Sequence, residues 1–285
     1  MANFDFDQAE GLRRMLAGPK PRIVTFLSAT RSEDKGALMM NLGASLVSTG
    51  NDVLIVDASP SARGIAARLG VAHGMSLQNA ARQECALDQV AKPMRQGFSL
   101  AALAREPLRS ARHSPDESRR MVKAFDFLVK QSGIVLVDAE LDADDELPLP
   151  ALAAGEIVVQ VSSNAASIKS AYCVIKRLNA KLGRRPFSIL VTGASENESK
   201  VVYDNMVEAA RRYLAIELKF MGSVPADEHL NRAARLGRSV VDAFPLAGAS
   251  VAFRRMAGRF SMQTAPAGMR SSQAGRPQLE TEGTY

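Results

Sequence analysis

Short apolar runs that alternate with amphipathic helical segments limit most strongly how this chain can fold. The runs are rich in Val, Ile, Leu and Phe and nearly continuous, as are strands covered on both faces of a sheet. They occupy residues 22–26, 52–58, 98–103, 133–139, 156–163, 187–193 and 218–225. Helical patterns follow at 36–49, 114–131, 165–182, 199–215 and 246–259. This alternation predicts right-handed crossovers and an α/β fold: one P-loop NTPase-like domain, with a mostly parallel, twisted sheet and helices on both faces.

Length and composition define the extent of that domain. The 285 residues are 46% hydrophobic and 23% charged, which suits one large globular domain, assigned here to residues 21–260. Residues 261–285 are rich in Ser, Pro, Gly and Gln without an apolar pattern, and this predicts a disordered tail. No apolar run approaches the roughly 18 residues that span a bilayer, and residues 1–20 do not resemble a signal peptide. We therefore expect a cytoplasmic protein.

Charge and metal-ligating residue types favour neither nucleic-acid nor metal binding. The formal net charge is +6, but the basic residues are scattered and form no run of five or more, so no nucleic acid is expected as a partner. His73, His113 and His229 are isolated from one another and from any pattern with ligand spacing. Cys85 and Cys173 lie far apart in apolar helical contexts, which predicts buried free thiols.

The first 20 residues form a unit of their own. Residues 6–16 have a helical pattern, and "GPKP" at 18–21 ends it and acts as a stiff spacer. The apolar residues of the pattern share one face: Ala9, Leu12, Met15 and Leu16. A one-sided helix on a tether is typical of a partner-binding element, although the same periodicity allows it to pack on its own domain.

The stretch "LSATRSEDKGALMMNLG" (27–43) joins the first predicted strand to the first long helix and carries a lysine at the turn. In open α/β sheets, ligands bind beyond the carboxyl ends of the strands. The loop 28–36, Asp57 and Asp138 all follow predicted strands and fall at that edge. The position predicts a phosphate-type site, yet the loop has almost none of the glycines that such a site needs.

This arrangement resembles that of the MinD/ParA class of P-loop ATPases, and the resemblance implies a site for ATP and magnesium. With "NLG" at 41–43 in register, Lys35 falls on the family's phosphate lysine, Thr30 on its signature lysine and Gly36 on its magnesium hydroxyl. The resemblance implies two further sets of site residues. They are Thr192 and Pro225 for the nucleotide, and Asp57 and Asp138 for magnesium.

Several of these positions depart from the family's pattern. Arg31, Ser32 and Asp34 stand where the family has glycines, and they cannot bring backbone N–H groups close to phosphates as glycine does. Gly36 offers magnesium no oxygen, and Ser59 replaces the acid that is expected to position water. We therefore predict a degenerate ATPase with weak or no hydrolysis, and no confident catalytic residue.

Two interpretations of the remaining charged residues stay open. Lys35, Asp57 and Asp138 are either remnants that serve as helix caps and sheet-end groups, or parts of a weak nucleotide site.

Over residues 4–260 the chain more closely resembles the FlhG/FleN family of flagellar-number regulators. Three segments carry the resemblance: "DQAEGLRRML" (7–16), "SIKSAYCVIKRL" (167–178), and residues 213–260, which follow the family's closing pattern nearly continuously. The resemblance implies a regulator of flagellar number, placement and assembly that activates the FlhF GTPase through its N-terminal helix. The residues that match this activating motif are Asp7, Gln8, Ala9, Leu12 and Arg13.

The resemblance also leaves an alternative function, an active MinD-type ATPase switch that forms a homodimer with ATP, in flagellar biosynthesis or in cell-pole or partition positioning. Recruitment to the cell pole or flagellar base would follow from either function. The family ends in an amphipathic membrane-targeting helix, but the tail of this chain is polar, so membrane contact of that kind is not expected.

Overall fold

A computed structural model describes residues 21–30, 32–59, 64–71, 74–105 and 115–264. The strands are β1 (Arg22–Ser28), β2 (Val53–Ala58), β3 (Lys92–Pro93), β4 (Ser99–Ala102), β5 (Ile134–Ala139), β6 (Glu156–Ser162), β7 (Phe187–Thr192) and β8 (Leu218–Val224). The longer helices are α2 (Ser32–Ser48), α5 (Pro115–Lys130), α6 (Ala165–Leu182), α7 (Glu196–Leu214), α8 (Glu228–Arg235) and α10 (Gly248–Thr264). Short elements are α3 (Ile65–Arg68), α4 (Leu77–Ala81), η1 (Leu87–Gln89), η2 (Pro150–Ala153) and α9 (Val240–Ala243).

The strands form one eight-stranded sheet in the order β3-β4-β2-β5-β1-β6-β7-β8. Every pairing is parallel except that of β3 with β4, so the sheet is mostly parallel, as the sequence predicts. The central strands β2 and β5 are buried along their whole length, which explains their continuous apolar runs. The parallel strands end at one edge of the sheet, where a ligand site is expected.

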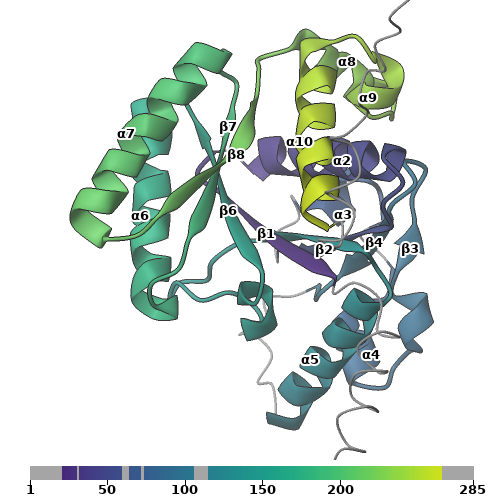
Figure 1. Ribbon diagram of the computed structural model, residues 1–285. Helices are drawn as coiled ribbons and strands as arrows, with labels where there is room; N and C mark the ends of the chain where they lie inside the picture. Colours follow the sequence, from purple (N-terminus) through teal and green to yellow (C-terminus); the bar gives the residue numbers. More distant parts are fainter. Residues whose placement is uncertain (1–20, 31, 60–63, 72–73, 106–114, 265–285) are drawn as a thin grey trace, which may run out of the picture.

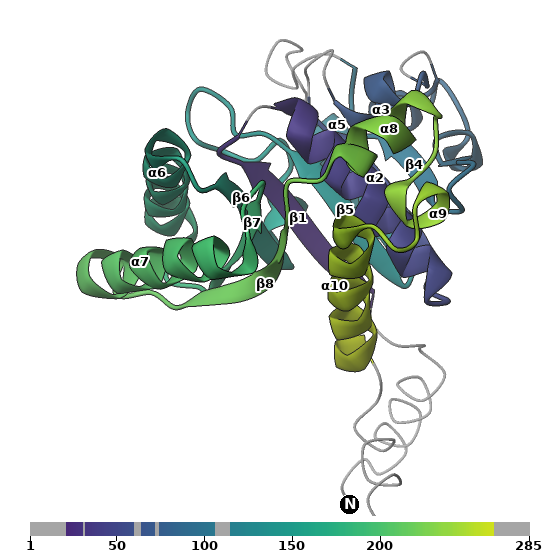
Figure 2. The same ribbon diagram turned by 90° about the horizontal axis from the view of Figure 1, so that it is seen from above.

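Helices cover both faces of the sheet, which confirms the predicted fold class (Figure 1). Helices α4, α5, α6 and α7 enclose one apolar core, whose large side chains include Phe125 and Phe187. Helices α2, α3, α8, α9 and α10 enclose the other, which contains Phe26, Phe98 and Phe253. Figure 2 shows α2 and α10 together on this second face, with α6 and α7 on the far side of the strands.

Helix α2 begins four residues earlier than the predicted helix at residue 36, with Ser32 as its first residue. Lys35 and Gly36 therefore lie in its first turn rather than in a loop. Helix α10 continues to Thr264, so it passes the domain boundary placed at residue 260. Residues 1–20 and 265–285 lie outside the described part, and with them the predicted N-terminal helix and most of the predicted tail.

The sequence analysis did not predict the short elements α3, α4, α8, α9 and β3, because two to eight residues carry too little periodicity to be recognised. The prediction of buried thiols is wrong for Cys173, which is exposed on α6, while Cys85 is partly buried. Its neighbours Ala171, Val174 and Ile175 are buried, so Cys173 occupies the solvent face of an otherwise apolar helical segment.

Candidate functional site

Asp57 and Asp138 are the penultimate residues of the neighbouring strands β2 and β5 and are direct partners in the strand register. Both are buried, with relative exposures of 5% and 1%. Two carboxylates in apolar surroundings need compensating charge or hydrogen-bond donors. Two elements supply them, the first turn of α2 and the start of α3.

Lys35 supplies the charge. Its Nζ lies 2.7 Å from Asp138 Oδ1 and donates a hydrogen bond of 2.6 Å to the carbonyl oxygen of Ala139. The side chain is only 3% exposed. The lysine that the sequence places at the phosphate position is thus held against the end of β5.

Backbone N–H groups at the start of α3 supply the remaining donors. Ala66 N donates to Asp57 Oδ2 at 2.8 Å, and Ile65 N donates to Asp138 Oδ2 at 3.3 Å. Gly64 makes this approach feasible, because a Cβ at that position would lie 2.5 Å from Asp57 Oδ2 and 2.6 Å from Oδ1. Lys35, Asp57, Asp138 and the backbone of 64–66 form one buried unit, called the ion cluster below.

The ion cluster is not neutral, and this changes the acidity of Asp57. Burial, followed by the charge of Asp138, raises the pKa of the Asp57 carboxyl, which comes to about 6 in the folded protein. The N–H groups of Ala66 and Ser59 and the charge of Lys35 oppose that rise. One lysine and a few N–H groups therefore only partly compensate two buried carboxylates.

A cavity of about 740 Å³ opens beside the ion cluster, beyond the ends of β1, β6, β7 and β8. Its apolar wall includes Ala37, Leu38, Val224, Pro225, Leu230 and Phe253. Its polar wall consists of hydroxyl and amide side chains: Thr30, Gln160, Ser162, Asn164, Ser167, Thr192 and Asn231. Among the described residues that line it, Arg68 from α3 is the one charged side chain. A cavity of this size suits a small molecule rather than a protein segment.

Gln160 is one of the cavity residues that the sequence analysis missed. Its side chain is fully buried, and Nε2 donates to the Thr192 hydroxyl at 3.2 Å. Oε1 has no hydrogen-bond partner among the described residues. The signal was present in the sequence as one amide inside the apolar run "EIVVQVSS".

The structure separates the predicted site residues into two groups. Thr30, Thr192 and Pro225 line the cavity, whereas Lys35, Asp57 and Asp138 belong to the ion cluster. At Gly36 a Cβ would lie 3.4 Å from Arg68 Cδ, so an aliphatic carbon of Arg68 occupies the space beside this position. Asp7, Gln8, Ala9, Leu12 and Arg13 lie outside the described residues.

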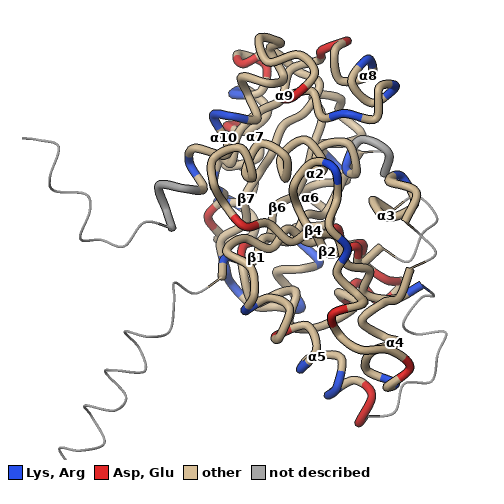
Figure 3. The backbone as a smooth tube through the Cα atoms, turned by 90° about the vertical axis from the view of Figure 1, so that its right-hand side faces the viewer, with Lys and Arg blue, Asp and Glu red and all other residues tan. Residues whose placement is uncertain are grey.

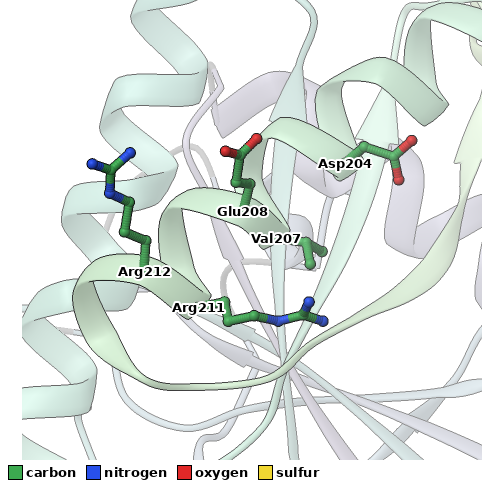
Figure 4. A pocket seen from close by; sticks show the side chains of 5 residues that line it. All are labelled: Asp204, Val207, Glu208, Arg211 and Arg212. Carbon is green, nitrogen blue, oxygen red and sulfur yellow. The ribbon is translucent and has the colours of Figure 1, made fainter.

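A second hollow, of about 390 Å³, lies on the outer face of α7. One helix provides all five lining residues: Asp204, Val207, Glu208, Arg211 and Arg212. Their charged ends point in different directions rather than converging, as Figure 4 shows. Converging polar groups are typical of small-molecule sites, so the cavity at the strand ends is the better candidate.

Other site types find little support in the described part of the chain. There, no group of three or more His, Cys, Asp or Glu side chains is placed to hold a metal ion, and no helix could cross a membrane.

The ring of His229 packs on that of Phe244, and its Nδ1 lies 2.7 Å from Asp227 Oδ1. On the side of the molecule in Figure 3, Lys and Arg are interspersed with Asp and Glu and form no continuous basic face.

The fold is that of the MinD and ParA ATPases. The MinD cell division protein of Aquifex aeolicus is 18% identical with a TM-score of 0.61, and covers 86% of this chain and 98% of its own. MinD of Pyrococcus horikoshii, solved with Mg-ADP, is 16% identical with a TM-score of 0.63, over 86% of this chain and 99% of its own. A ParA family ATPase of Chlorobium tepidum is 17% identical with a TM-score of 0.61, over 83% of this chain and 98% of its own.

Within this class, the chain is similar to the antiactivator FleN of Pseudomonas aeruginosa. The two are 26% identical over 237 residues, which cover 83% of this chain and 85% of the relative. No family model matches the sequence. The chain is thus similar in sequence to an antiactivator of the FleN type and has the fold of the MinD and ParA ATPases.

Proposed function

We propose that this protein regulates flagellar number or placement by binding partner proteins, and that its MinD-like domain acts as a scaffold without turning over ATP. The ion cluster is the observation that carries the proposal. Lys35 joins the first turn of α2 to the carboxyl end of β5. Backbone N–H groups at the start of α3 donate hydrogen bonds to the two carboxylates. Each of these charged groups has a partner within the fold.

The residues present do not fit a magnesium triphosphate group. Magnesium binding would need Asp57 or Asp138 to release N–H donors of α3, and it would gain no oxygen from Gly36. Phosphate binding would need Lys35 to leave a buried carboxylate, which then lacks its counter-charge. The similarity to an antiactivator supports the regulatory half of the proposal, because an antiactivator acts on another protein.

The partner that we propose is an FlhF-type GTPase, bound through residues 1–20. In that segment Gln8 would orient water beside GTP, while Leu12 and Ala9 would supply apolar contact. Homodimer formation and recruitment to the cell pole or flagellar base are further parts of the same proposal. The alternative, an ATP-driven switch, draws support from the neighbouring MinD structure with Mg-ADP.

ATP turnover tests the scaffold half of this proposal. We expect the wild-type chain to hydrolyse ATP no faster than a Lys35→Met/Asp138→Asn double variant, measured by phosphate release with magnesium. The double variant removes both partners of the ion pair, so no unpaired buried charge unfolds it. Turnover that depends on Lys35 would instead establish the ATPase switch.

A second arm of the experiment tests the partner half. A peptide of residues 1–20 should raise GTP turnover by an FlhF-type GTPase, and Gln8→Ala should lower this stimulation with little loss of binding. Leu12→Asp should abolish binding, because it places a charge in an apolar contact. A peptide that neither binds nor stimulates the GTPase would refute the proposed partner.

A further inference from the structure

A third hollow, of about 480 Å³, lies beside β8, the last strand in the sheet order. It shares no lining residue with the cavity at the strand ends. Helix α7 provides all but one of its lining residues, and β8 provides the other. They are Glu196, Asn197, Lys200, Tyr203, Asp204 and Phe220. The hollow is thus formed where α7 packs against the edge strand.

Two aromatic rings belong to this lining. The ring centroids of Tyr203 and Phe220 lie 5.1 Å apart, with the ring planes tilted by 52°. The Tyr203 hydroxyl donates a hydrogen bond of 2.8 Å to the carbonyl oxygen of Leu218, which fixes this ring against β8. The side chain of Phe220 remains 37% exposed. A ligand can therefore reach an aromatic ring here, and the faces of such rings carry partial negative charge.

The surroundings of Tyr203 are negatively charged. Burial, followed by the charges of Asp204 and Glu217, raises the pKa of the Tyr203 hydroxyl. The charge of Arg211 opposes this rise. Both carboxylates are exposed, and neither has an ion-pair partner in the described part of the chain. In Figure 4 the Asp204 carboxylate lies well apart from the guanidinium group of Arg212. Aromatic rings beside unpaired carboxylates suit a cation.

The other charged residues of the lining modify this preference. Glu196 is already paired, since its Oε1 lies 3.2 Å from Arg255 Nη1. Lys200 is the one cation of the lining, and it is exposed. Its ammonium group competes with an incoming cation, but the long, flexible stem lets it move into the solvent. The hollow therefore accepts a cation against partial competition from Lys200.

We propose that this hollow binds the guanidinium group of an arginine side chain on a partner protein. The planar guanidinium stacks on the accessible ring of Phe220 and donates hydrogen bonds to the Asp204 carboxylate. Arginine fits better than lysine, because its planar group can stack and donate at the same time. The lining residues are mostly exposed, so a free small molecule gains few contacts, whereas a side chain presented by a protein is held by the surrounding interface.

This contact goes beyond the proposed function, because it uses neither residues 1–20 nor the ion cluster. NMR titration of the full chain tests it with two short, blocked glycine peptides that differ in one residue. One peptide carries a central arginine, and the other carries citrulline, which has nearly the same shape and no charge. The ring signals of isotope-labelled tyrosine report binding, and Tyr203→Phe identifies the signal of Tyr203. We expect the arginine peptide to bind about fivefold more tightly, the change that a cation–π contact at a surface site provides.

Substitutions in the hollow should change this ratio in opposite directions. Asp204→Asn should lower it by removing the carboxylate, and Lys200→Gln should raise it by removing the competing cation. Phe220→Leu should remove most of it, since leucine keeps an apolar side chain but has no ring. Glu208→Gln is the matched control, because Glu208 is an exposed carboxylate on α7 outside the lining of this hollow. It should leave the ratio unchanged.

The wild-type comparison needs no substitution, so it decides the matter even if a variant fails to fold. Equal binding of the two peptides, or no shift of the Tyr203 signal at tens of millimolar peptide, would overturn the inference. An arginine preference that survives both Phe220→Leu and Asp204→Asn would overturn it as well, because the contact would then lie elsewhere. None of these results bears on ATP turnover or on the peptide of residues 1–20, so the proposed function stands or fails separately.

Discussion

At the scale of single residues, the ion cluster joins two carboxylates to one lysine in a nearly dry environment. Asp138 has the lysine at 2.7 Å, whereas Asp57 relies mainly on N–H donors. Asp57 therefore carries most of the uncompensated cost of burial, and its pKa rises to about 6. A carboxyl pKa raised by folding means that the native state holds its proton to a higher pH than the unfolded chain does.

This shift predicts how stability depends on pH. The unfolded Asp57 loses its proton near pH 4 and the folded one near pH 6, so its contribution to stability is complete below pH 4. It is lost as the pH rises through 6, on the order of 3 kcal/mol in total. We expect the free energy of unfolding of Asp57→Asn to rise relative to that of wild type as the pH increases from 4 to 6. Above pH 6 the difference between the two proteins should stay constant. Urea unfolding at a series of pH values measures it.

Asp126→Asn is the control for this measurement, because Asp126 is exposed on α5. Its difference from wild type should stay flat over the same range. A difference between Asp57→Asn and wild type that is equally flat would contradict the buried, protonated carboxyl.

At the scale of elements, two helical glycines differ in how closely their surroundings pack against them. Gly43 lies where α2 crosses the sheet, and a Cβ there would lie 2.9 Å from Ile55 Cδ1 and 3.1 Å from Phe98 Cδ1. Both neighbours are fully packed in the core. Gly258 in α10 has nothing within 4 Å of the same position. The close approach at Gly43 brings the first turn of α2, with Lys35, down to the strand ends.

These two positions give a matched pair of substitutions. Gly43→Ala should destabilise the fold by about 1–3 kcal/mol, since overpacking outweighs the gain in helix propensity. Gly258→Ala should stabilise it by about 0.5–1 kcal/mol through helix propensity alone. Equilibrium unfolding in urea measures both, and equal effects of the two alanines would show that α2 is not closely packed on the sheet.

At the scale of the whole molecule, the last helix closes the fold onto its first strand. Phe253, Met256 and Phe260 of α10 are buried in the core shared with α2. The guanidinium of Arg22 lies 4.1 Å from the ring centroid of Phe260, and Arg22 Nη2 lies 2.6 Å from Glu156 Oε2. The start of β1 and the end of α10 therefore stabilise each other.

Truncation tests this arrangement. A chain of residues 1–264 should unfold at the wild-type temperature, because all described contacts of α10 remain. A chain of residues 1–247 should fail to fold, since burial of each large apolar side chain contributes about 1.5–3 kcal/mol and a domain has only about 5–15 in total. Circular dichroism distinguishes the outcomes, and a cooperative melt of the 1–247 chain would show that α10 is dispensable.

The sequence by itself determined the class of fold. Strands such as β2 and β5 are recognisable because each is a continuous apolar run, and burial on both faces requires that pattern locally. It also determined that Lys35, Asp57 and Asp138 lie at one edge of the sheet, because parallel strands end together. The resemblance to the FlhG/FleN family likewise came from residues readable along the chain, and the sequence similarity to FleN and the MinD-like fold agree with it.

Only the tertiary structure decided how these residues are used. The partner of Lys35 depends on the contact of α2 with β5, across 103 positions between residues 35 and 138, and no local pattern encodes it. Nothing in the local sequence shows that position 64 requires glycine. The requirement arises because the backbone there passes so close to the Asp57 carboxylate that a Cβ would not fit. Gln160 was readable as a polar residue in a strand, but the pairing of β6 with β7 brings Thr192 to its amide and leaves one end open. Local periodicity specifies elements, whereas hydrogen bonds and charges between distant elements depend on register and packing.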